Sequence, residues 1–131
     1  MTPAEARELV AQALDSGKYE QGRGALCSGY KYCCLGVATE VYMKHHPDVV
    51  SVEEGEFKRY SIGGARQDLC LLEPIRVWLG FKSHLGSFIN KDGSQMHLTS
   101  LNDQGTPFTV IAHLFRHPPE GLVDDSVPAQ E

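Results

Sequence analysis

The sequence lacks a long apolar run. Lys, Glu, Ser or Gly interrupts its apolar stretches every few positions, far short of the roughly 20 residues that a membrane-spanning helix needs. The N-terminus has no basic segment followed by an apolar stretch, so it indicates no secretory signal. No internal repeat is present either. We therefore expect a cytoplasmic protein that does not associate with membranes.

An excess of positive charge is also missing. The net charge is -5 and the isoelectric point is near 5.6, whereas nonspecific nucleic-acid binders normally carry a basic face. This balance disfavours nonspecific nucleic-acid binding. The basic residues do gather in two short regions, 18–31 and 58–76, which leaves a small anionic ligand open.

The sequence has little that would hold a metal or require disulfides. Its four cysteines are Cys27, Cys33, Cys34 and Cys70. A chain with an adequate core and no export signal does not need disulfides, so we expect reduced thiols. His113 and His117 are four residues apart, but no Cys-x2-Cys pair accompanies them. The spacing therefore predicts neither a zinc site nor another cofactor.

Apolar residues recur at helical spacing in four segments of the chain. The first segment follows a capping box of Thr2 and Glu5, with Pro3 at the first helical position. The predicted helices extend over about residues 3–16, 33–45, 71–79 and 106–117. A chain of 131 residues is long enough for one domain with one core.

Hairpins are predicted between these helices. Ser28-Gly29 is a two-residue turn signal for the first hairpin, and Gly63-Gly64 is expected to end the second. The predicted strand pairs are 24–27 with 30–32, 49–52 with 57–62, and 88–90 with 95–99. The predicted fold class is therefore α+β, with about four helices and two or three short β-hairpins that form a small antiparallel sheet.

The C-terminal segment differs in composition from the rest of the chain. Residues 118–131 include four acidic residues, three prolines and few large apolar groups. Such a segment can bury little apolar surface. We therefore predict one globular domain over residues 1–117 and a disordered acidic tail over residues 118–131.

Four motifs carry a resemblance to a known family. They are Gln21-Gly22-Arg23-Gly24-Ala25-Leu26, Tyr32-Cys33-Cys34-Leu35-Gly36-Val37, Trp78-Leu79-Gly80 and Leu101-Asn102-Asp103-Gln104-Gly105. Over about residues 5–116 the chain resembles a family of small, largely uncharacterised bacteriophage and bacterial proteins with a Gln-Gly, Cys-x-Leu-Gly and Asn-Asp pattern. The resemblance implies an accessory role in a phage, including modulation of host defences, and a location in the host cytoplasm.

Five residues of these motifs are the candidate ligand-binding residues. They are Gln21, Gly22, Arg23, Asn102 and Asp103. Glycine lets backbone amides approach a ligand closely, and arginine makes bidentate contacts with phosphate or carboxylate. If these residues bind a small anionic, nucleotide-like ligand, Gln21, Arg23, Asn102 and Asp103 should converge on one pocket. Turn formation by Asn102 and Asp103, and a loop-fixing role for Gln21, remain alternatives.

A cysteine-dependent hydrolase or transferase is the alternative function. Cys33 would be the nucleophile, with its pKa lowered at the start of a helix. His97 would be the general base, and Asn102 or Asp103 would orient it. The opposing interpretation is that Cys33 and Cys34 are small apolar residues of the core, because cysteine is among the most buried residue types.

Binding to a host protein is the alternative to binding a small ligand. It requires no internal pocket, but it does require an apolar or aromatic patch on the surface. The candidates for this patch are Phe57, Tyr60, Phe81 and Phe88. Trp78, on the apolar face of a predicted helix, is expected in the core.

Overall fold

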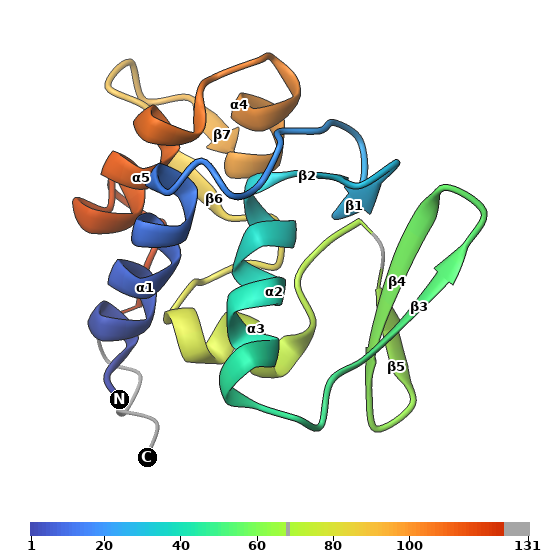
Figure 1. The fold of residues 1–131 in the computed structure, drawn as a ribbon. Helices are drawn as coiled ribbons and strands as arrows, with labels where there is room; N and C mark the ends of the chain where they lie inside the picture. The colour runs from blue at the N-terminus through green and yellow to red at the C-terminus, as the bar shows by residue number, and fades with distance from the viewer. Residues whose placement is uncertain (68, 125–131) are drawn as a thin grey trace.

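The computed structural model describes residues 1–67 and 69–124, which form five helices and seven strands (Figure 1). The helices are α1 (Pro3–Asp15), α2 (Cys34–His45), α3 (Glu73–Leu79), α4 (Leu98–Asp103) and α5 (Phe108–Arg116). The strands are β1 (Cys27–Ser28), β2 (Lys31–Tyr32), β3 (Val50–Glu54), β4 (Phe57–Ile62), β5 (Ala65–Gln67), β6 (Ser87–Ile89) and β7 (Gln95–His97). The predicted α+β class is confirmed.

Helix α1 begins at its predicted cap and packs along α5 at one side of the molecule (Figure 1). The Thr2 hydroxyl accepts from the Glu5 backbone N–H at 3.2 Å, and the Glu5 carboxylate accepts from the Thr2 backbone N–H at 3.0 Å. This reciprocal pair satisfies two N–H groups that the helix leaves without partners. Arg116 of α5 then donates to the carboxylates of Glu8 and Asp15, which joins the two helices at their surface.

Helix α2 is the central helix, and its first turn presses against the chain before β1. The Leu26 carbonyl accepts from the Cys33 backbone N–H at 3.1 Å. A Cβ atom added to Gly36 would lie 1.9 Å from the same carbonyl oxygen. Only glycine permits this approach of helix and strand.

The first hairpin turns one position later than the sequence indicates. Ser28 belongs to β1, and the two residues between the strands are Gly29 and Tyr30, with φ of 59° and 63°. A tight two-residue turn that matches the strand twist needs positive φ at both positions. Tyr30 adopts this conformation and directs its side chain into solvent, where it is 77% exposed.

The main sheet contains five strands, with the order β2-β1-β4-β3 and with β5 paired to β4. The second predicted hairpin is confirmed as β3 and β4, which pair antiparallel from Val50↔Ser61 to Glu54↔Phe57. Gly63-Gly64 ends β4, as predicted, and the positive φ of both glycines turns the chain into β5, a strand that the sequence did not predict. The three strands β3, β4 and β5 lie at the opposite side of the molecule from α1 and α5 (Figure 1).

The third predicted hairpin forms a separate two-stranded sheet of β6 and β7. Its second strand ends at His97, and the next residue begins α4. The sequence prediction extended this strand to Thr99 and placed Asn102 and Asp103 in a turn, so it missed α4. With only six residues, α4 is too short to show a helical period.

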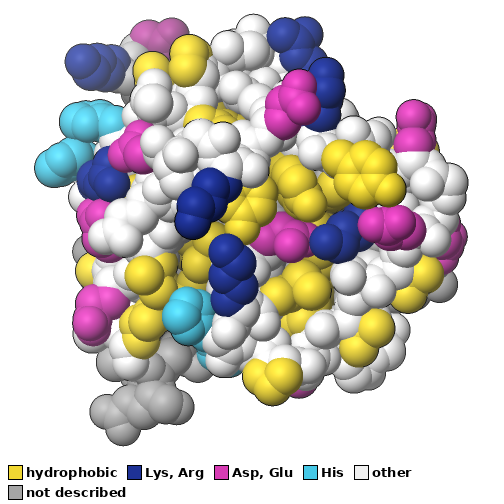
Figure 2. Space-filling model, viewed as in Figure 1, with side chains coloured by type: hydrophobic (Ala, Val, Ile, Leu, Met, Phe, Trp, Pro, Cys, Tyr) yellow, Lys and Arg dark blue, Asp and Glu magenta, His cyan; other side chains and the backbone are white. Residues whose placement is uncertain are grey.

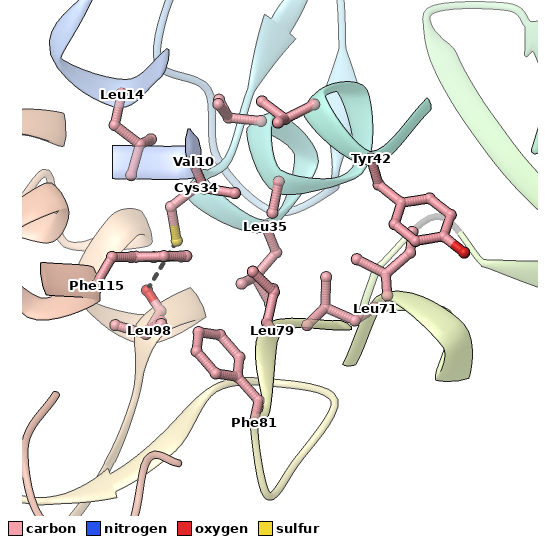
Figure 3. Packing of buried hydrophobic residues seen from close by; sticks show 14 of the residues in the cluster. Val10, Leu14, Cys34, Leu35, Tyr42, Leu71, Leu79, Phe81, Leu98 and Phe115 are labelled. Carbon is pink, nitrogen blue, oxygen red and sulfur yellow. Dashed lines mark hydrogen bonds between the residues drawn. The ribbon is translucent and has the colours of Figure 1, made fainter. Parts of the chain in front are cut away.

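The core lies where α1, α2, α3 and α5 meet. Leu35 of α2, Leu79 of α3 and Phe115 of α5 are buried at its centre, next to Phe81 (Figure 3). The Cys34 thiol donates to the Leu98 carbonyl at 3.7 Å, which ties α2 to α4 (Figure 3). Trp78 is buried, as predicted.

The globular domain extends beyond its predicted end at residue 117. Leu122 is fully buried, and its carbonyl accepts from the Lys82 backbone N–H at 3.0 Å. The Glu120 carbonyl accepts from the Ile89 backbone N–H at 2.7 Å. Leu122 is therefore an apolar anchor that the acidic composition of this segment did not indicate, and residues 118–124 belong to the fold. The predicted disorder of residues 125–131 falls outside the described residues.

A helix that crosses a membrane must be long and mostly apolar. Over residues 1–67 and 69–124, none of the helices has the length and apolar character needed to cross a membrane.

Candidate functional site

A polar network is centred on Asn102, whose side chain is fully buried. Its carbonyl oxygen accepts from the Gln21 side-chain amide at 3.0 Å and from the Cys34 backbone N–H at 3.2 Å. Its amide donates to the Gly22 carbonyl at 2.7 Å. One side chain therefore joins the loop after α1 to the first residue of α2 and to α4.

Gln21 and Asp103 complete this network. The Gln21 amide also donates to the Thr106 carbonyl at 2.7 Å. The Asp103 carboxylate accepts from the Gly24 backbone N–H at 3.0 Å. Gln21, Asn102 and Asp103 therefore lie together, but these hydrogen bonds are made within the protein, and the convergence of these residues with Arg23 on one ligand pocket stays a prediction.

Gly22 and Arg23 lie in the same loop and differ in their surroundings. A Cβ atom on Gly22 would lie 2.7 Å from the Lys31 Cβ, so glycine is required for the loop to pass β2. The Arg23 side chain is exposed, with its Nη2 atom next to Gly105. Of the five candidate residues, Arg23 offers the most accessible donors to a ligand, and ligand binding by this cluster stays a prediction.

A cavity of about 170 Å³ lies beside the network. The residues that line it are Gly24, Ala25, Cys33, Leu69, Leu85, Thr99 and Asp103. Its charged lining group is the Asp103 carboxylate, which repels anions. The cavity therefore suits an anionic ligand poorly.

Cys33 is the N-cap of α2 and is only 3% exposed. Its sulfur accepts from the Gly36 backbone N–H at 3.3 Å. Burial raises the pKa of the Cys33 thiol to about 11, although the N–H groups of Gly36 and Leu35 act in the opposite direction. The prediction of a lowered pKa was wrong, because the cost of desolvating a thiolate exceeds the stabilisation by the helix terminus.

The ring of His97, the predicted general base, forms a hydrogen bond with Ser87. Its ring Nδ1 lies 2.6 Å from the Ser87 hydroxyl across the β6–β7 pair. His97 does not line the cavity that Cys33 and Asp103 share. The Asn102 side chain, fully engaged in its network, is not a hydrogen-bond partner of this ring. The arrangement gives little support to a Cys33–His97 pair.

We expect the Cys33 thiol to be nearly inert in the native protein. At pH 8 a thiol with a pKa of about 11 is roughly 0.1% ionised, against about a quarter for an ordinary cysteine. Iodoacetamide should therefore alkylate Cys33 at least about 100-fold more slowly in the native protein than in urea, as measured by peptide mass spectrometry. Equal rates in the two states would instead indicate a reactive nucleophile.

The described residues offer no metal centre. Within residues 1–67 and 69–124, no three His, Cys, Asp or Glu side chains are placed to hold an ion together. The His113 and His117 rings are neighbours, with 4.7 Å between their centroids, and no third ligand joins them among these residues. Cys27, Cys33 and Cys34 are buried and form no disulfide.

A second polar cluster, which the sequence did not indicate, joins α2 to the sheet. The Lys58 ammonium and the Tyr60 hydroxyl both donate to one oxygen of the Glu40 carboxylate, each at 2.6 Å. Lys58 and Tyr60 are two residues apart on β4 and therefore share a face of the strand. Burial and the Glu40 carboxylate raise the pKa of Tyr60. Neutral Tyr60 thus remains a hydrogen-bond donor.

We expect Glu40→Ala to destabilise the protein by about 2 kcal/mol, because it leaves the Lys58 charge and the buried Tyr60 hydroxyl without their acceptor. Urea unfolding monitored by circular dichroism would measure this change. The control is Glu20→Ala, since Glu20 forms an exposed ion pair with Lys31 at 3.6 Å that should contribute less than about 0.5 kcal/mol. Equal stability of the two variants would contradict a structural role for the cluster.

Four aromatic side chains form one surface beside this cluster, which we name the aromatic face: Tyr19, Tyr30, Tyr32 and Phe57. Tyr30, Tyr32 and Phe57 line a cavity of about 140 Å³ between the tips of the two hairpins. The Tyr19 and Tyr32 rings meet edge to face, with 5.3 Å between their centroids. Figure 2 shows hydrophobic side chains gathered on this side of the molecule, between α2 and the β3–β4 hairpin.

The surface patch predicted from the sequence is corrected at three of its four positions. Tyr60, Phe81 and Phe88 are buried, whereas Phe57 is 41% exposed. Phe81 packs against Phe115, and Tyr60 bonds to Glu40. Tyr30 was not among the predicted residues, although a bulky residue next to a turn glycine is a signal for an exposed side chain.

The sequence matches a protein family over most of its length. Residues 3–118 match the family model described as a domain of unknown function (DUF8296). The match includes α1 through α5, and therefore both the Asn102 network and the aromatic face. No curated protein and no solved structure matches the chain.

Proposed function

The chain belongs to the DUF8296 family, and we propose that it is a non-enzymatic accessory protein that binds another protein through its aromatic face. It acts in the cytoplasm, which is that of the host if a phage encodes it. The resemblance in its Gln-Gly, Cys-x-Leu-Gly and Asn-Asp motifs supports the accessory role.

The observation that carries this proposal is the exposure of Tyr30 and Phe57 beside one cavity. Tyr30 is 77% exposed and Phe57 is 41% exposed, although both could bury apolar area. Tyrosine and phenylalanine are enriched in protein interfaces, and a few such residues supply most of the binding energy. The adjacent Glu40–Lys58–Tyr60 cluster fixes the strand that carries Phe57. The face is thus held in place before a partner binds.

The other candidate functions have weaker support. A small anionic ligand at Gln21, Arg23 and Asn102 would have to compete with hydrogen bonds that already satisfy Gln21 and Asn102. A cysteine-dependent enzyme would require a thiolate at Cys33, whose pKa burial raises to about 11. Binding to a protein through exposed side chains requires neither the replacement of these hydrogen bonds nor a thiolate at Cys33.

The double variant Tyr30→Asn with Phe57→Ala should weaken partner binding at least about tenfold, because truncation of a central aromatic residue typically costs 2 kcal/mol or more. Asparagine tolerates the positive φ of position 30, so the turn is retained. Partners captured from host lysate by the wild-type protein would be quantified by mass spectrometry and then titrated with each purified variant.

The matched control is Val110→Ala, which removes an exposed apolar side chain from α5. It should capture the same partners as the wild type with unchanged affinity. Capture that is equal for the double variant and the wild type would contradict the proposal, as would the absence of any stoichiometric partner of the wild-type protein.

A further inference from the structure

The aromatic face continues into a second cavity between α1 and α2. This cavity has a volume of about 240 Å³ and is lined by Leu9, Gln12, Ala13, Ser16, Lys18, Tyr19, Val41, Lys44 and His45. The hairpin cavity, of about 140 Å³, is lined by Cys27, Gly29, Tyr30, Tyr32, Glu53, Gly55, Glu56, Phe57 and Lys58. Tyr19 lines the cavity between α1 and α2, Tyr32 lines the hairpin cavity, and the two rings are in contact.

The two cavities therefore form one elongated surface with an aromatic centre. The edge-to-face pair of Tyr19 and Tyr32 forms the junction between them, with centroids 5.3 Å apart. Figure 2 shows this surface as hydrophobic side chains bordered by Lys or Arg over α1 and α2 and by Asp or Glu over the β3–β4 hairpin. An extended chain segment would contact both cavities and the aromatic junction at once.

The two ends of this surface carry opposite charge. At the helical end, Lys18 and Lys44 line the cavity, and the Lys44 ammonium lies 5.8 Å from the centre of the Tyr19 ring. At the hairpin end, the charged lining residues are Glu53, Glu56 and Lys58. Glu40 neutralises Lys58 at 2.6 Å, so this end is net acidic.

We propose that the occupant of this surface is an extended peptide segment of the partner protein, with acidic residues at one end, apolar residues in the middle and basic residues at the other end. The acidic end lies at Lys18 and Lys44, and the basic end lies at Glu53 and Glu56. Charge complementarity of this kind fixes the register and direction of a bound chain. The inference rests on the proposed function and adds the chemistry of the partner.

A display library of random peptides of about twelve residues tests this inference on the full chain. Peptides that bind the wild-type protein would be selected, and those that also bind the Tyr30→Asn, Phe57→Ala variant would be removed. We expect the survivors to carry acidic residues at one end, apolar residues in the middle and basic residues at the other. Survivors without this pattern would overturn the inference while leaving binding at the aromatic face intact.

Charge reversal provides the quantitative arm of the test. The Lys18→Glu, Lys44→Glu variant should bind a selected peptide at least about tenfold more weakly, and replacement of the acidic end of the peptide by lysines should restore the affinity. The control Lys82→Glu changes an exposed lysine outside both cavities and should leave affinity unchanged. Equal affinity for all three proteins would overturn the inference. So would a selection that yields no peptide dependent on Tyr30 and Phe57, whereas the proposed function is judged separately by capture of whole partner proteins.

Discussion

Replacement of Gly36 by alanine is expected to destabilise the protein by about 3 kcal/mol or more, which is roughly a 10 °C decrease in Tm. The added Cβ would lie 1.9 Å from the Leu26 carbonyl oxygen, and both groups belong to backbone. In a solvent-exposed helix the same substitution would stabilise the protein by about 1 kcal/mol, because alanine has a higher helix propensity than glycine. The sign of the change in urea unfolding is therefore diagnostic of this contact.

A substitution at the exposed end of the same helix serves as the control for Gly36→Ala. His45→Ala removes a side chain from the last turn of α2 and should change the free energy of unfolding by about 0.5 kcal/mol or less. A Gly36→Ala protein that is as stable as His45→Ala would show that α2 does not rest on the Leu26 carbonyl.

Removal of the Asn102 side chain is the second large expected effect. Asn102→Ala should cost about 3 kcal/mol, because it leaves one N–H of the Gln21 amide, the Cys34 N–H and the Gly22 carbonyl without their partner. Thermal and urea unfolding would measure the loss. The exposed neighbour Gln104, replaced by alanine, should leave stability within about 0.5 kcal/mol of the wild type.

Asn102→Asp separates hydrogen bonding from packing in the same network. An ionised aspartate has the same shape and can still accept from Gln21 and Cys34, but it cannot donate to the Gly22 carbonyl. It should therefore also destabilise the protein. Wild-type stability of both variants would contradict the assignment of Asn102 as the side chain that joins the loop to α2 and α4.

The sequence predicted the elements whose signals are local. The capping box at Thr2 and the glycine at position 80, with φ of 70°, define the ends of α1 and α3 through chemistry within a few residues. Helix α4 and strand β5 were missed because their signals are short. Leu122 was missed because one apolar residue in an acidic segment has no periodicity, and its burial depends on tertiary packing.

The candidate site shows the same division. The motifs indicated that Gln21 and Asn102 lie close together. They did not indicate that the two side chains form hydrogen bonds within the protein, because this depends on distances in the folded structure. The Glu40 cluster joins residues from a helix and a strand, so it arises only from tertiary packing. For Cys33, both the helix terminus and burial were foreseeable, and their relative magnitudes decided the pKa.

Hydrogen exchange of the chain, measured with and without the captured partner, tests the central claim most directly. The claim is that the partner binds the aromatic face, so the amides of residues 27–32 and 53–58 should exchange more slowly in the complex. The amides of residues 20–24 and 98–106, around Asn102, should be unchanged. Protection confined to those residues around Asn102, with unchanged exchange at the hairpin tips, would contradict the account.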